Sequence, residues 1–94
     1  MGADAPCTVP TIITPNGDNV NDNFIIPCLA TEDFPDNQVI IFNQWGDEVF
    51  SSKNYRNDWS GTYNGDDLPV GTYFWLVDFN KGEKPSAGFL VIER

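Results

Sequence analysis

The chain has no histidine among its 94 residues, and this absence limits the chemistry it can perform. A Ser-His-Asp or Cys-His nucleophilic arrangement cannot be assembled without histidine. There is also no glycine-rich loop of the P-loop or dinucleotide-binding type. Paired acids occur at Asp47-Glu48 and Asp66-Asp67, but they fall in predicted turns, and adjacent side chains on a strand point to opposite faces. We therefore expect solvated carboxylates and a protein that is not an enzyme.

Basic residues are scarce. Five Lys and Arg stand against fourteen Asp and Glu, which gives a formal net charge of −9. Such a surface repels nucleic acid and anionic lipid, so we expect no nucleic-acid partner and assign most carboxylates to solubility. No segment approaches the roughly 20 apolar residues that cross a bilayer, and no signal peptide opens the chain. We expect no membrane insertion, with residues 1–6 as linker or added residues and residues 7–94 as one excised C-terminal domain.

Cysteine occurs only at Cys7 and Cys28. In an acidic, β-rich domain the favoured interpretation is a disulfide between the first two strand regions. Closing a loop of that length stabilises by about 3 kcal/mol on the chain-entropy model. The alternative is two reduced thiols in a cytosolic protein. A metal role is not expected for two cysteines without histidine.

The stretch around which the chain is organised begins at residues 39–42, a short run rich in β-branched and aromatic side chains. Asn43 suits the first position of a type I turn, and Gly46 can adopt the left-handed conformation of a bulged hairpin. Val49-Phe50 resumes the apolar pattern. The stretch predicts a central β-hairpin with Trp45 near its tip. Trp45 is either a partner-binding anchor or an aromatic that folds back over the sheet edge as core, and the second alternative is favoured.

Short strand patterns separated by Gly, Pro, Asn and Asp turns continue along the whole chain. This spacing predicts an all-β fold, an immunoglobulin-like antiparallel β-sandwich of about seven short strands. The segment 68–73 is similar to a tyrosine corner, in which the phenol bonds back to the backbone. Tyr73, Phe74 and Trp75 are expected to be packing residues. The other expected strands cover residues 8–14, 24–26, 59–63, 73–79 and 88–93.

The polar loop from Asn16 to Asp22 is the candidate metal site. Oxygen ligands at alternate positions, namely Asn16, Asp18, the Val20 carbonyl and Asp22, are typical of the early part of a calcium loop, which needs six to eight oxygens. The bidentate glutamate that ends such a loop is missing, so Asp47, Asp66 or Asp67 would have to complete the shell. The alternative is an Asx-rich turn whose side chains bond the backbone. We expect no obligatory cofactor, with calcium as an optional ligand.

Five sequence blocks together resemble the gliding-motility-associated C-terminal domain. Residues 13–24 resemble its TPNGDGxNDxF opening, residues 41–50 its IFNRWGxxVF centre and residues 59–61 its WDG. Residues 68–74 resemble its LPxGTYFY, and residues 88–94 its closing GxIxIxR. The blocks follow the family's order, and the resemblance covers nearly the whole chain, from about residue 8 to residue 94.

Three positions depart from the family's pattern. Asn19 stands in place of glycine, which Asn can replace because it tolerates the left-handed conformation. Gln44 stands in place of a basic residue, which removes a charge that a partner could recognise. Ser60 stands in place of aspartate, which weakens a capping or metal role at that position.

The resemblance implies a type B sorting domain of the type IX secretion system, at the C-terminus of a large surface adhesin or secreted protein. Such cargo enters the periplasm by a separate signal and reaches the cell surface or medium through an outer-membrane translocon, with an outer-membrane partner protein. The oxidising periplasm is compatible with a Cys7–Cys28 disulfide. The isolated domain is expected to be a monomer.

For the recognition surface we expect Trp45 and a terminal strand that offers an open edge for strand addition. That strand consists of Gly88, Phe89, Leu90, Val91, Ile92, Glu93 and Arg94, with Arg94 as a charged handle. Two alternatives stay open. One is an immunoglobulin-like adhesion or carbohydrate-binding module that uses Trp45 and the Asn16–Asp22 loop. The other is a spacer without a specific partner.

Overall fold

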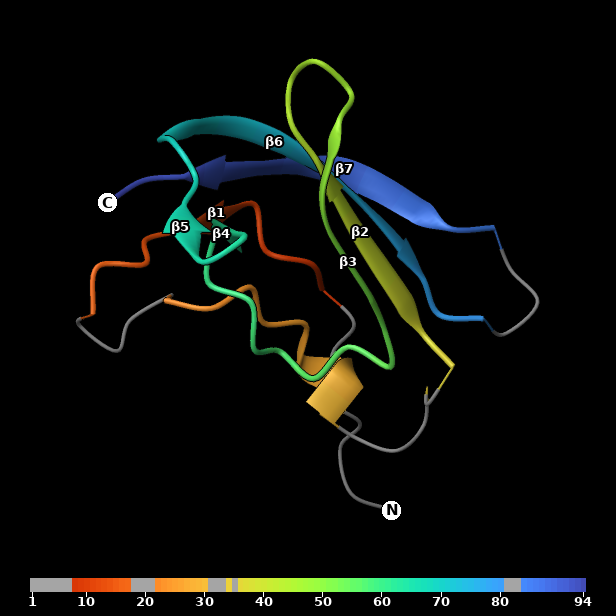
Figure 1. The fold of residues 1–94 in the computed structure, drawn as a ribbon. Helices are drawn as coiled ribbons and strands as arrows, with labels where there is room; N and C mark the ends of the chain where they lie inside the picture. Colours follow the sequence, from red (N-terminus) through yellow and green to blue (C-terminus); the bar gives the residue numbers. More distant parts are fainter. Residues whose placement is uncertain (1–7, 18–21, 31–33, 35, 81–83) are drawn as a thin grey trace.

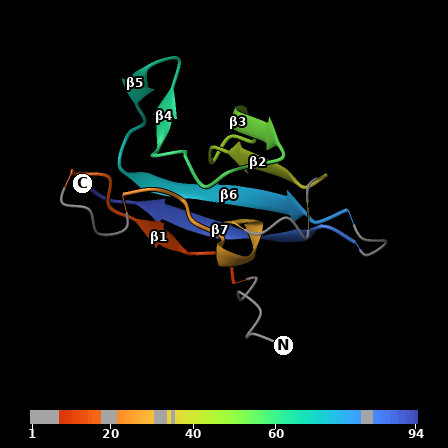
Figure 2. The same cartoon turned by 90° about the horizontal axis from the view of Figure 1, so that it is seen from below.

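The computed structural model describes residues 8–17, 22–30, 34, 36–80 and 84–94. These residues form seven strands and one 3-10 helix (Figure 1): β1 Ile12–Ile13, η1 Pro27–Ala30, β2 Gln38–Phe42, β3 Glu48–Lys53, β4 Thr62–Tyr63, β5 Asp66–Asp67, β6 Gly71–Asp78 and β7 Ser86–Ile92. Five strands make one sheet in the order β1-β7-β6-β2-β3, and β4-β5 is a separate hairpin beside it (Figure 2). The predicted all-β class with about seven short strands is confirmed, and the arrangement is consistent with an immunoglobulin-like sandwich.

The central hairpin forms as predicted from β2 and β3, which pair antiparallel with a register shift between Ile41 and Phe42. Its turn is held by Asn43. The Asn43 carbonyl accepts from the Gly46 amide at 3.0 Å, and its side-chain Oδ1 accepts from the amides of Trp45 and Asp47 at 2.9 Å each. Gly46 has φ +86°, the left-handed conformation that glycine adopts without strain. The conformation of the turn is therefore determined by residues within the loop itself.

β6 lies between β2 and β7 and shows the period-two alternation of a strand. Tyr73 and Val77 are buried, and the Tyr73 hydroxyl donates to the Pro69 carbonyl at 2.8 Å, which confirms the tyrosine corner. Phe74 points to the other face and is 45% exposed. The expectation that Phe74 is a packing residue in the core is therefore wrong, because consecutive residues of one strand cannot share a buried face.

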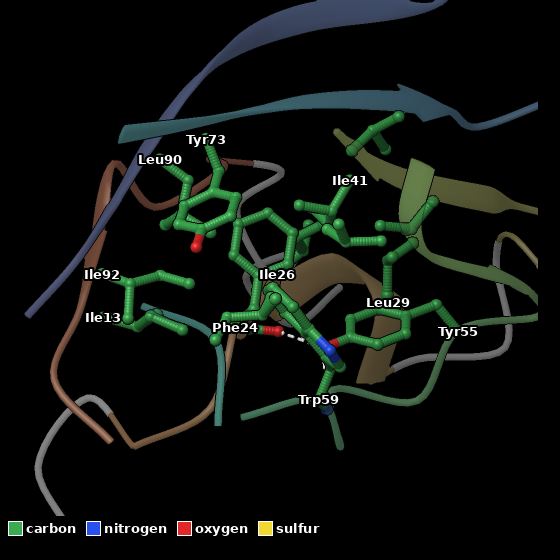
Figure 3. Close-up of a cluster of buried hydrophobic side chains, with 14 of the residues drawn as sticks. Ile13, Phe24, Ile26, Leu29, Ile41, Tyr55, Trp59, Tyr73, Leu90 and Ile92 are labelled. Atoms are coloured by element: carbon green, nitrogen blue, oxygen red, sulfur yellow. Dashed lines mark hydrogen bonds between the residues drawn. The ribbon is translucent and has the colours of Figure 1, made fainter. Parts of the chain in front are cut away.

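The second layer of the sandwich is largely irregular. Phe24, Ile26 and Leu29 pack with Tyr55 and Trp59 against the inner face of the sheet (Figure 3). The strand expected over residues 24–26 does not form. Its backbone bonds a loop instead: the Phe24 amide donates to the Trp59 carbonyl at 2.8 Å, and the Ile26 amide donates to Asn57 Oδ1 at 2.9 Å.

The first expected strand is also shorter than predicted. Residues 8–14 contribute only β1, which runs parallel to β7, whereas the other strand pairs are antiparallel. This one parallel pair departs from the purely antiparallel order that was expected. Of the strand expected over residues 59–63, only Thr62–Tyr63 pairs, with β5 across the Asn64-Gly65 turn.

Tyr55 organises the buried cluster. It is fully buried, its hydroxyl donates to the Phe24 carbonyl at 2.6 Å, and it accepts from the Trp59 amide at 3.1 Å. Burial raises the pKa of this phenol, so it stays neutral and can donate. Buried Asn37 orients Tyr55, because its Oδ1 accepts from the Tyr55 amide at 2.9 Å.

Replacing Tyr55→Phe is expected to lower the free energy of unfolding by about 1–3 kcal/mol, because two buried backbone groups lose their shared partner. Urea denaturation measures the change. Tyr73→Phe is the matched control: its hydroxyl makes one bond, to the Pro69 carbonyl, at a part-buried site, so a loss of about 0.5–1.5 kcal/mol is expected. A larger loss for Tyr73→Phe than for Tyr55→Phe would contradict the central role of Tyr55.

Candidate recognition site

Trp45 stands at the tip of the β2–β3 hairpin, which projects above the sheet in Figure 1, and its side chain is 74% exposed. The expectation that Trp45 folds back over the sheet edge as core is wrong. The Asn43 side chain binds the amides on both sides of Gly46 and so fixes the turn. An exposed tryptophan on a fixed turn suits partner binding, because little ordering entropy is lost on contact.

A groove of about 410 Å³ lies between the hairpin tip and the tyrosine corner. Trp45 and Val70, which is 61% exposed, belong to its lining, together with the nearly buried Val49 and Leu68. Polar groups also line it, from Asn43, Gln44, Asp47 and Thr72. A groove that combines apolar and polar groups is suited to holding a side chain of a partner protein.

The predicted C-terminal recognition strand does not form one surface. Leu90 and Ile92 are fully buried, whereas Phe89 is 50% exposed on the opposite face. β7 pairs with β6 along its whole length and with β1 at Val91 and Ile92. The expected open edge is therefore wrong at Val91 and Ile92. Recognition through the exposed residues of this strand stays a prediction.

Gly88 has a packing role. A Cβ atom at this position would lie 2.4 Å from Cζ2 of Trp75. The indole Nε1 of Trp75 donates to the carbonyl of Phe89 at 2.9 Å, so the ring lies across Gly88 and is held there. Gly88 lies in the segment that resembles the family's closing GxIxIxR, but nothing in the sequence indicates its aromatic partner on β6.

Arg94 is a structural connector, and the expectation of a free charged handle is wrong. Its Nη2 donates to the carbonyls of Gly61 and Leu68 at 2.9 Å each. Its Nη1 donates to the Pro15 carbonyl at 3.3 Å and lies 3.6 Å from Asp67 Oδ1. The side chain is only 22% exposed. The fork of donors in a guanidinium allows one residue to join three separate segments.

The candidate calcium loop is described only at its ends, and Asp18 and Val20 lie outside the described residues. Asp22 Oδ1 accepts from the amides of Asn16 and Gly17 at 3.2 Å each. These two bonds run from a side chain to the backbone of the same loop, as the alternative of a hydrogen-bonded polar turn predicts. Within the described ranges, no group of three or more acidic or cysteine side chains is placed to hold a metal ion. The calcium site stays a prediction.

Cys28 is buried in η1, with an exposed fraction of 2%. Cys7 lies outside the described residues, so the Cys7–Cys28 disulfide also stays a prediction.

Comparison with known proteins gives one result. The family described as CHU_C type IX secretion signal domain matches residues 7–92. No curated protein and no solved structure matches the chain. Among the described residues no helix is long and apolar enough to cross a membrane. Because the match covers nearly the whole chain, this protein belongs to the type IX secretion signal domain family.

Proposed function

We propose that this domain is the C-terminal address of a large adhesin or secreted protein, and that it directs its cargo through the type IX outer-membrane translocon by protein–protein recognition. The observation that carries the proposal is the family match over residues 7–92. A type IX secretion signal interacts with the secretion machinery and directs its cargo to the cell surface or the medium. The finer steps proposed are transit through the periplasm and capture by an outer-membrane partner protein.

The groove at Trp45 supports recognition of a folded domain. Its lining residues come from the hairpin and from the tyrosine corner, which are separated in the sequence by residues 50–67 and meet only in the fold. The domain needs no catalytic group or obligatory cofactor for this role, because an address has only to be bound. As an isolated domain it is proposed to act as a monomer.

The test is export of a periplasm-targeted fluorescent protein that carries residues 7–94 at its C-terminus, in a host with a type IX system. Fluorescence on the cell surface or in the medium, lost in a translocon mutant, is the expected result. Retention of the folded fusion in the periplasm would contradict the proposal. Trp45→Ala is expected to reduce export without lowering stability, because the side chain is exposed. Tyr63→Ala, on β4 and 49% exposed, is the matched control.

The exposed Trp45 beside polar groups also favours a second candidate, an adhesion module that stacks a sugar ring on the indole. Glycan-array binding that is lost in Trp45→Ala would support this candidate. A fusion that is exported normally and binds no glycan would exclude it.

A further inference from the structure

The outer face of the five-stranded sheet, opposite the core, carries a row of three phenylalanines. Phe42 on β2 pairs with Phe74 on β6, and Phe74 pairs with Phe89 on β7. Phe74 and Phe89 are 45% and 50% exposed, and Phe42 is half-buried. Residues paired across neighbouring strands lie about 5 Å apart on one face. The three rings therefore form one apolar row across the middle of the sheet.

Apolar residues extend this row in both directions. Ile40 pairs with Leu76 on one side of it, and on the other side Val91 pairs with Ile12, which is 40% exposed. A hollow of about 500 Å³ lies over the phenylalanine row. At roughly 4.8 Å between strands and 3.3 Å per residue, the face measures about 500 Å² in projection. One side of a standard protein interface covers about 800 Å² of accessible surface, so this face supplies most of such a site.

The charges that the described strands place around this face are mainly acidic. The register places Glu48 opposite Phe42 and Asp78 opposite Gln38, and Glu93 continues the alternation beyond Val91. Lys53, opposite Gln38, is the one basic residue that the described strands place on this face. An apolar surface with an acidic rim complements an apolar surface with a basic rim, and charge complementarity of this kind selects partners and speeds encounter.

The net charge of −9 argues against the other occupants of an apolar face. Two copies of the chain would bring like charges together around the contact, and anionic lipid would be repelled. The face is also continuous with the groove at the hairpin tip, because Thr72 lies on the outer side of β6 and lines that groove. A partner that covers the phenylalanine row can therefore reach Trp45 as well.

We infer that the outer sheet face, centred on Phe42, Phe74 and Phe89, is the docking surface for a protein of the secretion machinery whose contact surface is apolar with a Lys/Arg-rich rim. This inference rests on the proposed function and assigns a surface to it. The phenylalanine row provides the contact energy, and the acidic rim provides orientation.

The first test compares two double variants of the export fusion. Phe74→Thr/Phe89→Thr removes the rings but keeps residues that favour strands. It is expected to lower export by about tenfold or more, because truncated aromatic anchors each cost around 2 kcal/mol or more of binding. The control is Ile25→Thr/Tyr63→Thr, two apolar residues that are each 49% exposed away from this face. The control is expected to be exported like the wild type.

The second test does not depend on the apolar residues. Glu93→Lys reverses one rim charge, and Asp66→Lys makes the same change of charge on β5, in the separate β4-β5 hairpin. Each exchange moves the net charge from −9 to −7, because it adds two charges. The rim variant is expected to reduce export, and the control variant is not. If thermal denaturation shows that the phenylalanine variant does not fold, this comparison of charge variants still tests the docking surface.

The outcomes separate the two proposals. If the wild-type fusion is not exported, the proposed function fails. If the wild type is exported and both face variants are exported equally well, the docking surface is wrong and the function stands. Two further results would overturn the inference: a wild-type dimer in sedimentation equilibrium that Phe74→Thr/Phe89→Thr converts to monomer, or binding to phosphatidylglycerol vesicles that this variant abolishes.

Discussion

Deletion of residues 88–94 is expected to unfold the domain completely. β7 occupies an interior position between β6 and β1, so its loss removes a strand on which two neighbours depend. Leu90 and Ile92 are fully buried, and losing a large buried aliphatic side chain costs about 2–5 kcal/mol. Their combined loss approaches the whole stability of a small domain, about 5–15 kcal/mol. Failed export of this truncation would therefore report a lost fold rather than a lost contact.

Circular dichroism and thermal denaturation of the truncated chain measure this effect, and a cooperative melting transition would contradict it. Arg94→Ala is the finer variant. It keeps β7 but removes the donors to the Gly61, Leu68 and Pro15 carbonyls. A loss of about 1.5–3 kcal/mol is expected, because these hydrogen bonds come from a charged group. Arg94→Lys should recover only part of it, since an ammonium lacks the planar fork.

Asp67→Asn is the matched control for the ion pair. Asp67 is 70% exposed, and exposed ion pairs contribute about 0–1 kcal/mol. The carbonyl contacts of Arg94 remain in this variant, so its stability should stay close to that of the wild type. A loss as large as that of Arg94→Ala would show that the ion pair, and not the carbonyl contacts, holds the C-terminus.

Gly88→Ala is expected to destabilise the domain by about 1–3 kcal/mol, the range for overpacking a filled site. The new Cβ would lie 2.4 Å from Cζ2 and 2.8 Å from Cε2 of Trp75, well inside the roughly 3.5–4.0 Å of an optimal carbon contact. The ring cannot move away freely, because Nε1 of Trp75 is bonded to the Phe89 carbonyl. Gly88→Val should cost more than Gly88→Ala, and urea denaturation measures both.

A double-mutant cycle separates this clash from a general effect on β7. In a Trp75→Leu background the space above Gly88 is larger, so Gly88→Ala should cost less than in the wild type. Coupling between contacting residues is typically about 0.5–3 kcal/mol. Additive costs would show that Gly88→Ala acts through the strand backbone and not through the indole.

The parts of the candidate site that sequence predicted depend on local chemistry. The hairpin turn follows from Asn43 and Gly46, whose hydrogen bonds and positive φ lie within one loop. The tyrosine corner joins residues only four positions apart. The order of the family blocks predicted membership, and the match over residues 7–92 confirms it. In each case the interacting groups are close in the chain, or the pattern can be identified directly in the amino-acid sequence.

Other features were decided by contacts between distant segments. The backbone of Phe24–Ile26 bonds a loop more than 30 residues later, so a strand-like composition does not become a strand. Arg94 bonds carbonyls 26, 33 and 79 residues away, and no local pattern could distinguish such a connector from a free handle.

The sequence by itself determined the all-β class, the central hairpin, the tyrosine corner and the family, because turn chemistry and period-two patterns act between near neighbours. Only the tertiary structure decided which face of each strand meets the core, where β7 lies in the sheet, and that Trp45 and Phe74 reach the surface. The physical reason is that hydrophobic burial is non-directional. An aromatic residue suits a core and an exposed contact surface equally, and the strand register alone assigns it to one of them.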